Sequence, residues 1–156
     1  LAAFGATDTD TTGGAGHGNV TVTTVGPVLL TDINGGTGVA LDGNLTVTAA
    51  GSLTQFTGTS LLVGGATSAT TSAGNITLTN AGNNLAAFAA ADTDSAGGAG
   101  HGNVAVTTTG ALALGAINGG SGSTVLNGNL TVIAGGVPLT FEKRDITCAV
   151  EGSRIS

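Results

Sequence analysis

Two Asp-Thr-Asp sequences carry the side chains in this chain that are best suited to chemistry. Asp8 and Asp10 form the first pair, Asp92 and Asp94 form the second, and a glycine-rich run follows each pair. Calcium takes about six to eight oxygen ligands, which two carboxylates and nearby carbonyl groups begin to supply. The glycine-rich runs are similar to a calcium-binding nonapeptide, but glycine stands where that motif has its aspartate. We therefore expect the four aspartates to be solvated loop residues, with calcium binding as the alternative.

The same carboxylates would be the catalytic pair of a glycosidase, and His17 and His101 would be metal ligands if others lay beside them. Sugar-processing sites generally use aromatic platforms and a basic group. This chain has no Trp or Tyr, and residues 1–136 contain no Lys or Arg. No nucleophile-elbow sequence is present either. We expect no enzymatic activity, no cofactor and no metal, and we interpret the histidines as residues tolerated in glycine-rich turns.

A Gly-Asn sequence that occurs five times indicates the elements that hold these residues. Each copy begins with a turn signal, because Gly allows a positive φ and Asn suits a tight bend. An alternation of apolar and polar residues with period 2 follows, which indicates a strand with one buried face. The copies begin at Gly18, Gly43, Gly74, Gly102 and Gly128. Their spacing varies around a period that is typical of solenoids.

A longer duplication overlies this repeat, since residues 1–38 and 85–122 are near copies offset by 84 positions. The 84-residue unit contains three Gly-Asn sequences, so we interpret it as three coils averaging 28 residues (84/3). Phe4 and Phe88 match in the two copies, and we expect them to plug the same place in the core one unit apart. The two histidines would then be separated by ~14 Å, at ~4.8 Å per coil, which is too far to share an ion.

The sequence therefore predicts an all-β fold, a right-handed parallel β-helix (solenoid) of about five to six coils of about 25–31 residues. We expect the Gly-Asn strands to form one parallel sheet, with one set of apolar side chains facing inward. This set comprises Val20, Val22, Val28, Leu30, Ile33, Leu45, Val47, Leu53, Leu61, Val63, Ile76, Leu78, Val104, Val106, Leu112, Leu114, Ile117, Leu130 and Val132.

Stacked coils would also place the asparagines of the five copies in one column at a turn, where their side chains can hydrogen-bond from coil to coil. Four of these asparagines lie in Asn-x-Thr sequons, so glycan attachment is the alternative. We favour the turn ladder because Asn103 recurs with its glycine although it lacks the threonine. The predicted ladder consists of Asn19, Asn44, Asn75, Asn103 and Asn129.

Threonines alternate with the inward residues and are expected to form a flat outward array. Such an array resembles the ice-binding face of solenoid antifreeze proteins, but it is interrupted at Ala105 and Ile133, and Thr suits any exposed strand. Ice binding is therefore only an alternative. The predicted array consists of Thr21, Thr23, Thr46, Thr48, Thr77 and Thr79.

Charge excludes two classes of partner. The net charge is −6, and all basic residues lie in the last 14 positions, so the repeat offers no attraction to phosphate or anionic lipid. We expect neither a nucleic-acid nor a membrane-surface partner. The single cysteine, Cys148, forms no internal disulfide. The chain starts inside a repeat, so we expect it to be part of a longer chain with further coils at both ends of the solenoid.

The Gly-Asn-(Val/Leu/Ile)-Thr-Val repeats, followed by Gly-x-Leu-x-Leu, resemble filamentous-haemagglutinin-type and autotransporter adhesins over about residues 1–136. These are bacterial surface proteins with right-handed parallel β-helix passengers. The resemblance implies a structural stalk or adhesin segment of a large exported protein at the bacterial cell surface, without catalysis. It also implies a host-cell receptor or glycan as the partner. The alternative from another class is a carbohydrate-active β-helix, a polysaccharide lyase or hydrolase.

The C-terminal segment, residues 137–156, departs from the repeat. Residues 137–141 predict one more strand, whereas residues 142–156 contain three acidic and three basic side chains. This segment is either a polar cap over the end of the solenoid or a tail of non-native or misread origin. We therefore divide the chain into a β-helix segment at 1–136 and a divergent segment at 137–156.

Overall fold

The structure is a computed structural model that describes residues 2–9, 18–36, 38–94, 101–120, 125–136 and 140–141. Within these ranges the chain forms twelve strands and no helix. None of the described residues therefore belongs to a helix long and apolar enough to cross a membrane. The strands are β1 (Ala2–Thr7), β2 (Val20–Thr24), β3 (Val28–Asn34), β4 (Leu45–Ala49), β5 (Leu53–Gln55), β6 (Leu62–Thr71), β7 (Ile76–Leu78), β8 (Asn84–Asp92), β9 (Val104–Thr108), β10 (Ala113–Asn118), β11 (Leu130–Ala134) and β12 (Thr140–Phe141).

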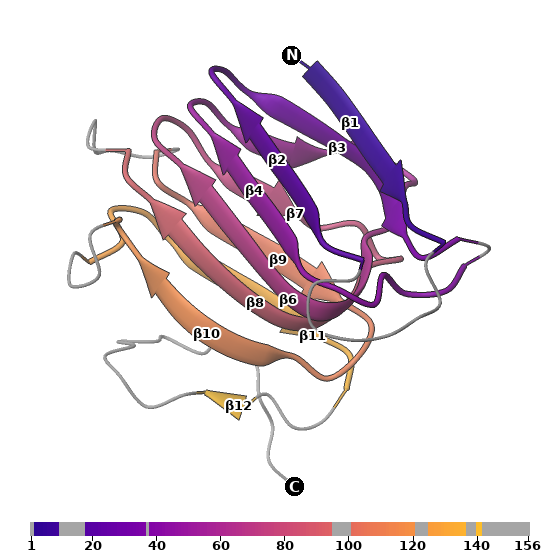
Figure 1. Cartoon of the computed structure of the whole chain (residues 1–156). Helices are drawn as coiled ribbons and strands as arrows, with labels where there is room; N and C mark the ends of the chain where they lie inside the picture. Colours follow the sequence, from indigo (N-terminus) through magenta and orange to yellow (C-terminus); the bar gives the residue numbers. More distant parts are fainter. Residues whose placement is uncertain are drawn as a thin grey trace, which may run out of the picture.

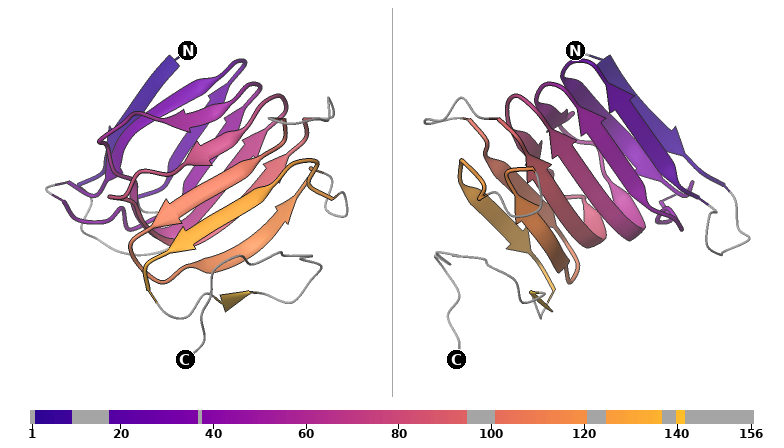
Figure 2. Two further views of the ribbon diagram at one scale, coloured as in Figure 1. Left: turned by 180° about the vertical axis from the view of Figure 1, so that it is seen from behind. Right: turned by 60° about the vertical axis from the view of Figure 1, so that its left-hand side comes forward.

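The strands alternate between two parallel six-stranded sheets that face each other (Figure 1). The odd-numbered strands form the first sheet in the order β1-β3-β5-β7-β9-β11, and the even-numbered strands form the second sheet from β2 to β12. Each coil therefore contributes one strand to each sheet and pairs with the coil before and the coil after. The result is a β-solenoid of about five turns, which confirms the predicted fold class. Figure 2 shows the stack from behind and from the side.

The coils in the middle of the stack are shorter than the Gly-Asn spacing predicts. Among the residues paired on neighbouring strands, Thr67 pairs with Phe88 in a short coil and Ile76 pairs with Val104 in a longer one. The predicted coil length is therefore wrong for the shorter coils in the middle of the stack. The error begins between Leu45 and Ile76, where the longest interval between Gly-Asn copies covers three strand-to-strand steps instead of two.

This extra step overturns the prediction that all Gly-Asn strands share one sheet. The first two copies form β2 and β4 in the second sheet, whereas the last three form β7, β9 and β11 in the first sheet. The short coils leave room for β5 and β6 between the second and third copies. The Gly-Asn sequence therefore specifies a turn followed by a strand, but it does not specify the sheet to which that strand belongs.

The 84-residue unit accordingly contains seven strands, β1 to β7, before its copy begins with β8, which amounts to three and a half coils instead of the predicted three. Equivalent residues in the two copies lie in opposite sheets. Phe4 is half-buried in β1 of the first sheet, and Phe88 is buried in β8 of the second sheet. The expectation that the two phenylalanines plug the same place is therefore wrong.

The core between the sheets matches the predicted inward set. Fifteen of its nineteen members are buried, and the other four (Val20, Ile117, Leu130 and Val132) are half-buried and pack against the same cluster. Val104 pairs with Ile76 on one side and with Leu130 on the other, as the sequence predicts. Sequence patterning missed buried Leu41 and Leu85, as well as several inward alanines.

The outward threonines divide between the sheets in the same way as the Gly-Asn strands. Thr21 pairs with Thr46 and Thr23 with Thr48 in the second sheet, but Thr77 lies on β7 in the first sheet. On the next strand of this sheet, β6, Ser68 and Thr70 pair with the threonines of β4. The single array that the sequence predicts is therefore wrong, because its last members face the opposite side of the solenoid.

The predicted strand at residues 137–141 is represented by the two-residue β12, which pairs in parallel with β10. Residues 137–139 and 142–156 lie outside the described residues. The boundary of the divergent segment and the choice between a cap and a tail therefore stay as predictions.

Candidate functional site

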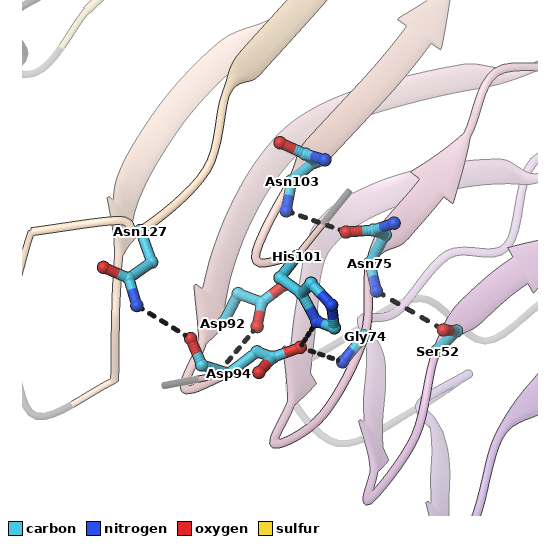
Figure 3. Close-up of polar contacts among 8 residues, drawn as sticks. All are labelled: Ser52, Gly74, Asn75, Asp92, Asp94, His101, Asn103 and Asn127. Atoms are coloured by element: carbon cyan, nitrogen blue, oxygen red, sulfur yellow. Dashed lines mark hydrogen bonds and ion pairs between the residues drawn. The ribbon is translucent and has the colours of Figure 1, made fainter. Parts of the chain in front are cut away.

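The second Asp-Thr-Asp sequence lies at the end of β8, where the chain leaves the second sheet and turns toward β9 (Figure 3). Only 1% of Asp92 and 6% of Asp94 is exposed, so the expectation of solvated loop residues is wrong for this pair. The cause is the alternation of β8, which turns Leu85, Phe88, Ala90 and then Asp92 toward the core. Neighbouring strands β6 and β10 cover β8 on both edges.

Asp94 joins three successive corners of the solenoid. Its Oδ2 accepts a hydrogen bond from the Gly74 backbone N–H at 2.7 Å, at the corner between β6 and β7. The same oxygen lies 3.0 Å from His101 Nδ1, which precedes β9. The Asp94 carbonyl accepts a hydrogen bond of 3.0 Å from Asn127 Nδ2, before β11. Through these contacts Asp94 connects neighbouring coils, as Figure 3 shows.

The Asp92 side chain makes fewer hydrogen bonds than that of Asp94. Its Oδ1 accepts a hydrogen bond of 3.0 Å from the Asp94 backbone N–H, whereas its Oδ2 is buried without a hydrogen-bond partner. Burial raises the pKa of the Asp92 carboxyl above its ordinary value. The Asp94 amide and the neighbouring Thr71 hydroxyl oppose this rise, and the charge of Asp94 adds to it. Asp92 is 1% exposed, so its carboxyl group is not accessible to a polysaccharide at this position.

His101 has a defined partner, contrary to its interpretation as a residue merely tolerated in a turn. About half of its side chain (49%) is exposed, while only 7% of the Asp94 side chain is. A repeated spacing could have revealed this contact, because Asp and His stand seven positions apart in both copies. The second of these pairs is Asp94–His101, and the first is Asp10–His17.

The first copy differs from the second where it is described. Asp8, the equivalent of Asp92, is half-buried, and its backbone N–H donates to the Asn34 carbonyl at 3.0 Å. Asp10 and His17 lie outside the described residues. Among the residues that the structure describes, no group of three His, Cys, Asp or Glu side chains is arranged to hold a metal ion.

The asparagines of the Gly-Asn copies form hydrogen-bonded ladders, but there are two ladders instead of the single predicted column. In the first, Asn44 N–H donates to Asn19 Oδ1 and Ala66 N–H donates to Asn44 Oδ1, each at 2.8 Å. In the second, Asn103 N–H donates to Asn75 Oδ1 at 3.0 Å and Asn129 N–H donates to Asn103 Oδ1 at 2.7 Å.

The break between Asn44 and Asn75 has the same cause as the change of sheet. Three strand-to-strand steps separate the two residues, so they reach different corners of the coil. In both ladders a side-chain oxygen accepts a backbone N–H of the next coil, so each asparagine extends the backbone pairing around a turn. The ladders are therefore structural contacts between coils.

A buried amide cluster has no counterpart in the predicted sites. Asn83 is fully buried, and its Oδ1 accepts hydrogen bonds from Leu61 N–H at 2.9 Å and from Gln55 Nε2 at 2.7 Å. Its Nδ2 donates to Gln55 Oε1 at 3.0 Å and to the Leu78 carbonyl at 3.2 Å. The cluster closes a corner of the core with both side-chain polar atoms of Asn83 paired. Nothing in the alternation identifies Asn83, because it lies between strands.

Comparison with known families supports the repeat and not a particular activity. A family model described as "Repeats of unknown function (DUF5649)" matches residues 17–92. This span begins just before β2 and ends with β8, so it covers seven consecutive strands. Searches of curated proteins and of solved structures gave no match. The fold and this match define the class of protein as an all-β repeat protein built as a parallel solenoid.

Proposed function

We propose that this chain is a non-catalytic stalk or adhesin segment of a large exported bacterial surface protein, which mediates attachment or display. The observation that carries the proposal is the unbroken stacking of coils. Each sheet continues through six parallel strands, and side-chain ladders connect the coils at their corners. A solenoid whose coils contact only their neighbours lengthens by duplication, and the 84-residue unit is such a duplication.

The proposed partner is a receptor or glycan on a host cell, and the proposed location is the outer surface of a bacterium. The resemblance to adhesin repeats supports both. The charge of the repeat fits a role without nucleic acid or anionic lipid, because residues 1–136 carry no Lys or Arg.

The proposed stalk role is tested by measuring whether an added repeat unit lengthens the molecule. A chain with residues 1–84 duplicated once more should be longer by ~17 Å, since three and a half coils are added at ~4.8 Å each. Small-angle scattering on both chains measures the change in maximum dimension. An unchanged length with a larger cross-section would show that added units fold back instead of extending the rod.

Adhesion and catalysis are tested on the same purified chain. The folded chain should bind to host cells and to glycans on an array, and thermal unfolding should abolish this binding. Incubation with a panel of acidic and neutral polysaccharides should release no reducing ends and no unsaturated products. Release of either would overturn the non-catalytic proposal and favour a lyase or hydrolase.

A further inference from the structure

Phe56 is an exposed aromatic side chain in a sequence that contains four phenylalanines and no Trp or Tyr. Phe88 is buried and Phe4 is half-buried, whereas 55% of Phe56 is exposed. Gln55, which ends β5, turns its amide toward the buried Asn83. Because side chains alternate along a strand, the next residue, Phe56, points outward. The ring therefore lies on the surface, where the chain passes from β5 to β6.

The turn that carries Phe56 is fixed by its own hydrogen bonds. Thr59 N–H donates to the Phe56 carbonyl at 3.2 Å, and Thr59 Oγ1 donates to the same oxygen at 2.7 Å. Gly58 has a φ of 85°, which a type II turn requires at its third position. A Cβ at Gly58 would meet nothing within 4 Å beyond its chain neighbours, so this part of the turn is open.

Both neighbouring coils hold the same turn. Phe56 N–H donates to the Leu30 carbonyl of the preceding coil at 2.8 Å. Ser60 N–H donates to Asp32 Oδ1 of that coil, also at 2.8 Å. From the following coil, Asn80 Nδ2 donates to the Phe56 carbonyl at 2.6 Å. The backbone beneath the ring is therefore held in place, and a ligand that binds there loses little free energy to ordering the site.

Hydrogen-bonding groups flank this turn on both sides. Asp32 Oδ2 and Asn80 Oδ1 accept no hydrogen bond from any residue that the structure describes. Thr57 is exposed, and its hydroxyl group can both donate and accept. An aromatic face with polar groups at its margin matches a sugar, because a pyranose has an apolar C–H face and hydroxyl groups at its edge.

Charge and the distribution of apolar groups narrow the class of ligand. The described residues include no Lys or Arg, and Asp32 adds a negative charge, so an acidic sugar would be repelled. A protein partner would be expected to cover a contiguous apolar patch. The other exposed large apolar side chains instead belong to four other segments of the described chain, namely Val25, Val39, Val125 and Ile133. A neutral sugar therefore fits this surface best.

We propose that the turn Phe56–Thr59 is a binding site for a neutral pyranose. The C–H face of the sugar stacks on the Phe56 ring, and its hydroxyl groups bond to Asn80 Oδ1, Asp32 Oδ2 and the Thr57 hydroxyl group. This inference rests on the proposed function, because it assigns a location to the glycan partner of an adhesin. A single ring buries little area, so attachment depends on many copies that bind together.

The site is tested by nuclear magnetic resonance on the nitrogen-15-labelled whole chain. The probes are the methyl glycosides of glucose, galactose, mannose and N-acetylglucosamine, and sodium glucuronate is the charged analogue. At least one neutral glycoside should shift the amide signals of Thr57, Gly58 and Asn80, and glucuronate should shift them less. Phe56→Ala should weaken binding by about tenfold or more. The hydrogen bonds of Phe56 are made by its backbone, so this variant should keep the fold.

Three further variants separate stacking from other effects. Phe56→Trp keeps an aromatic face and should retain binding. Phe56→Leu keeps an apolar side chain without that face and should lose binding as Phe56→Ala does. Val25→Ala is the matched control, since Val25 is 100% exposed on a different turn, and it should bind as wild type does.

The results distinguish the site from the proposed function. Undiminished binding by Phe56→Ala or Phe56→Leu, shifts confined to other parts of the chain, or no shift with any neutral glycoside would overturn the site. Attachment to host cells is measured separately on the same chains. Attachment by a chain that binds no sugar would overturn the site and leave the adhesin role. Sugar binding at Phe56 without attachment to cells would support the site and count against adhesion.

Discussion

At the scale of single residues, the direction of each side chain decides which substitutions the solenoid tolerates. Val104 is fully buried between Ile76 and Leu130, whereas Ala105, the next residue, is half-buried and faces outward. Val104→Asp should cost several kcal/mol, because an unpaired carboxylate in the core must stay desolvated or take up a proton. Ala105→Asp should change the free energy of unfolding by only about 0.5 kcal/mol. Urea melts of the two variants at neutral pH measure both values.

The two substitutions are matched in chemistry and adjacent in sequence. Any difference between them therefore reports the face on which each residue lies, because a register slip of one residue exchanges the two faces. Equal losses of stability, or a greater loss for Ala105→Asp, would contradict the register of β9.

Asn83 provides a second comparison of buried and accessible positions. Asn83→Ala removes the side-chain acceptor of Leu61 N–H and the amide that bonds Gln55 and the Leu78 carbonyl in the core. A buried group left unpaired costs about 1–3 kcal/mol, so with the other lost hydrogen bonds the loss should be about 2–5 kcal/mol. Asn80→Ala is the control, since Asn80 donates at the surface to the carbonyls of Phe56 and Thr59, which water can also serve. Chemical unfolding should show a loss of about 1 kcal/mol for Asn80→Ala.

Sequence patterning predicts which apolar residues are buried, but it misses the buried polar residues. The alternation places Val104 and its inward neighbours correctly, because burying them against each other is favourable in any coil. It assigns polar residues to the surface, so it misplaces Asp92 and does not find Asn83. Both are buried because of the strand and corner that happen to lie in the next coil, and the sequence of a single strand does not contain that information.

At the scale of elements, the asparagine ladders connect one strand's turn to the next. Asn103 Oδ1 accepts the N–H of Asn129 at 2.7 Å. Asn103→Ala removes this acceptor and should cost about 1 kcal/mol. Asn103→Asp keeps an acceptor oxygen at the same place, so its cost should be close to zero at neutral pH. Thermal or urea unfolding of the two variants makes the comparison.

The pair of variants separates the ladder from the glycan alternative. Neither substitution affects a sequon, because Asn103 is followed by Val104 and Ala105. An equal loss for Asn103→Ala and Asn103→Asp would mean that the oxygen at this position does not support the coil.

Turns were predictable because local sequence determines them. Asn34 Oδ1 accepts the Gly36 N–H, and Asn118 Oδ1 accepts the Gly120 N–H, each at 2.8 Å. The two glycines have φ values of 88° and 118°, which favour Gly. These equivalent turns are alike although one follows a strand of the first sheet and the other a strand of the second sheet. Sheet membership was not predictable, since it depends on how many strands precede each copy.

At the scale of the whole molecule, an odd number of strands in the duplicated unit turns each copy through half a coil. The interval from Leu45 to Ile76 is compatible with one long coil or with one and a half short coils, and the Gly-Asn sequence is the same in both. The structure has the second arrangement, because β5 and β6 occupy the interval between the two residues. Successive units therefore present equivalent residues on opposite faces of the stalk, and two units are needed to return to the same face.

This half-coil rotation predicts a distance that spin labels can measure. Thr21 on β2 and Ala105 on β9 are equivalent in the two copies and lie outward on opposite sheets. Labels at this pair should be separated by three and a half coils, ~17 Å along the axis, and by the ~10 Å between sheets. They also point in opposite directions, which lengthens the distance further. Ala89 on β8 is the control, because the rungs Thr21, Thr46, Ser68 and Ala89 share one face.

Both double-cysteine variants carry Cys148→Ser, so that only the chosen positions are labelled. The control pair, Thr21 and Ala89, should give the shorter distance, since three coils on one face amount to ~14 Å. Double electron–electron resonance on the folded chains measures both distributions. If the unit were three whole coils, Thr21 and Ala105 would share a face and give the distance now expected for the control. Equal distances for the two pairs would therefore refute the half-coil rotation and the alternation of faces along the stalk.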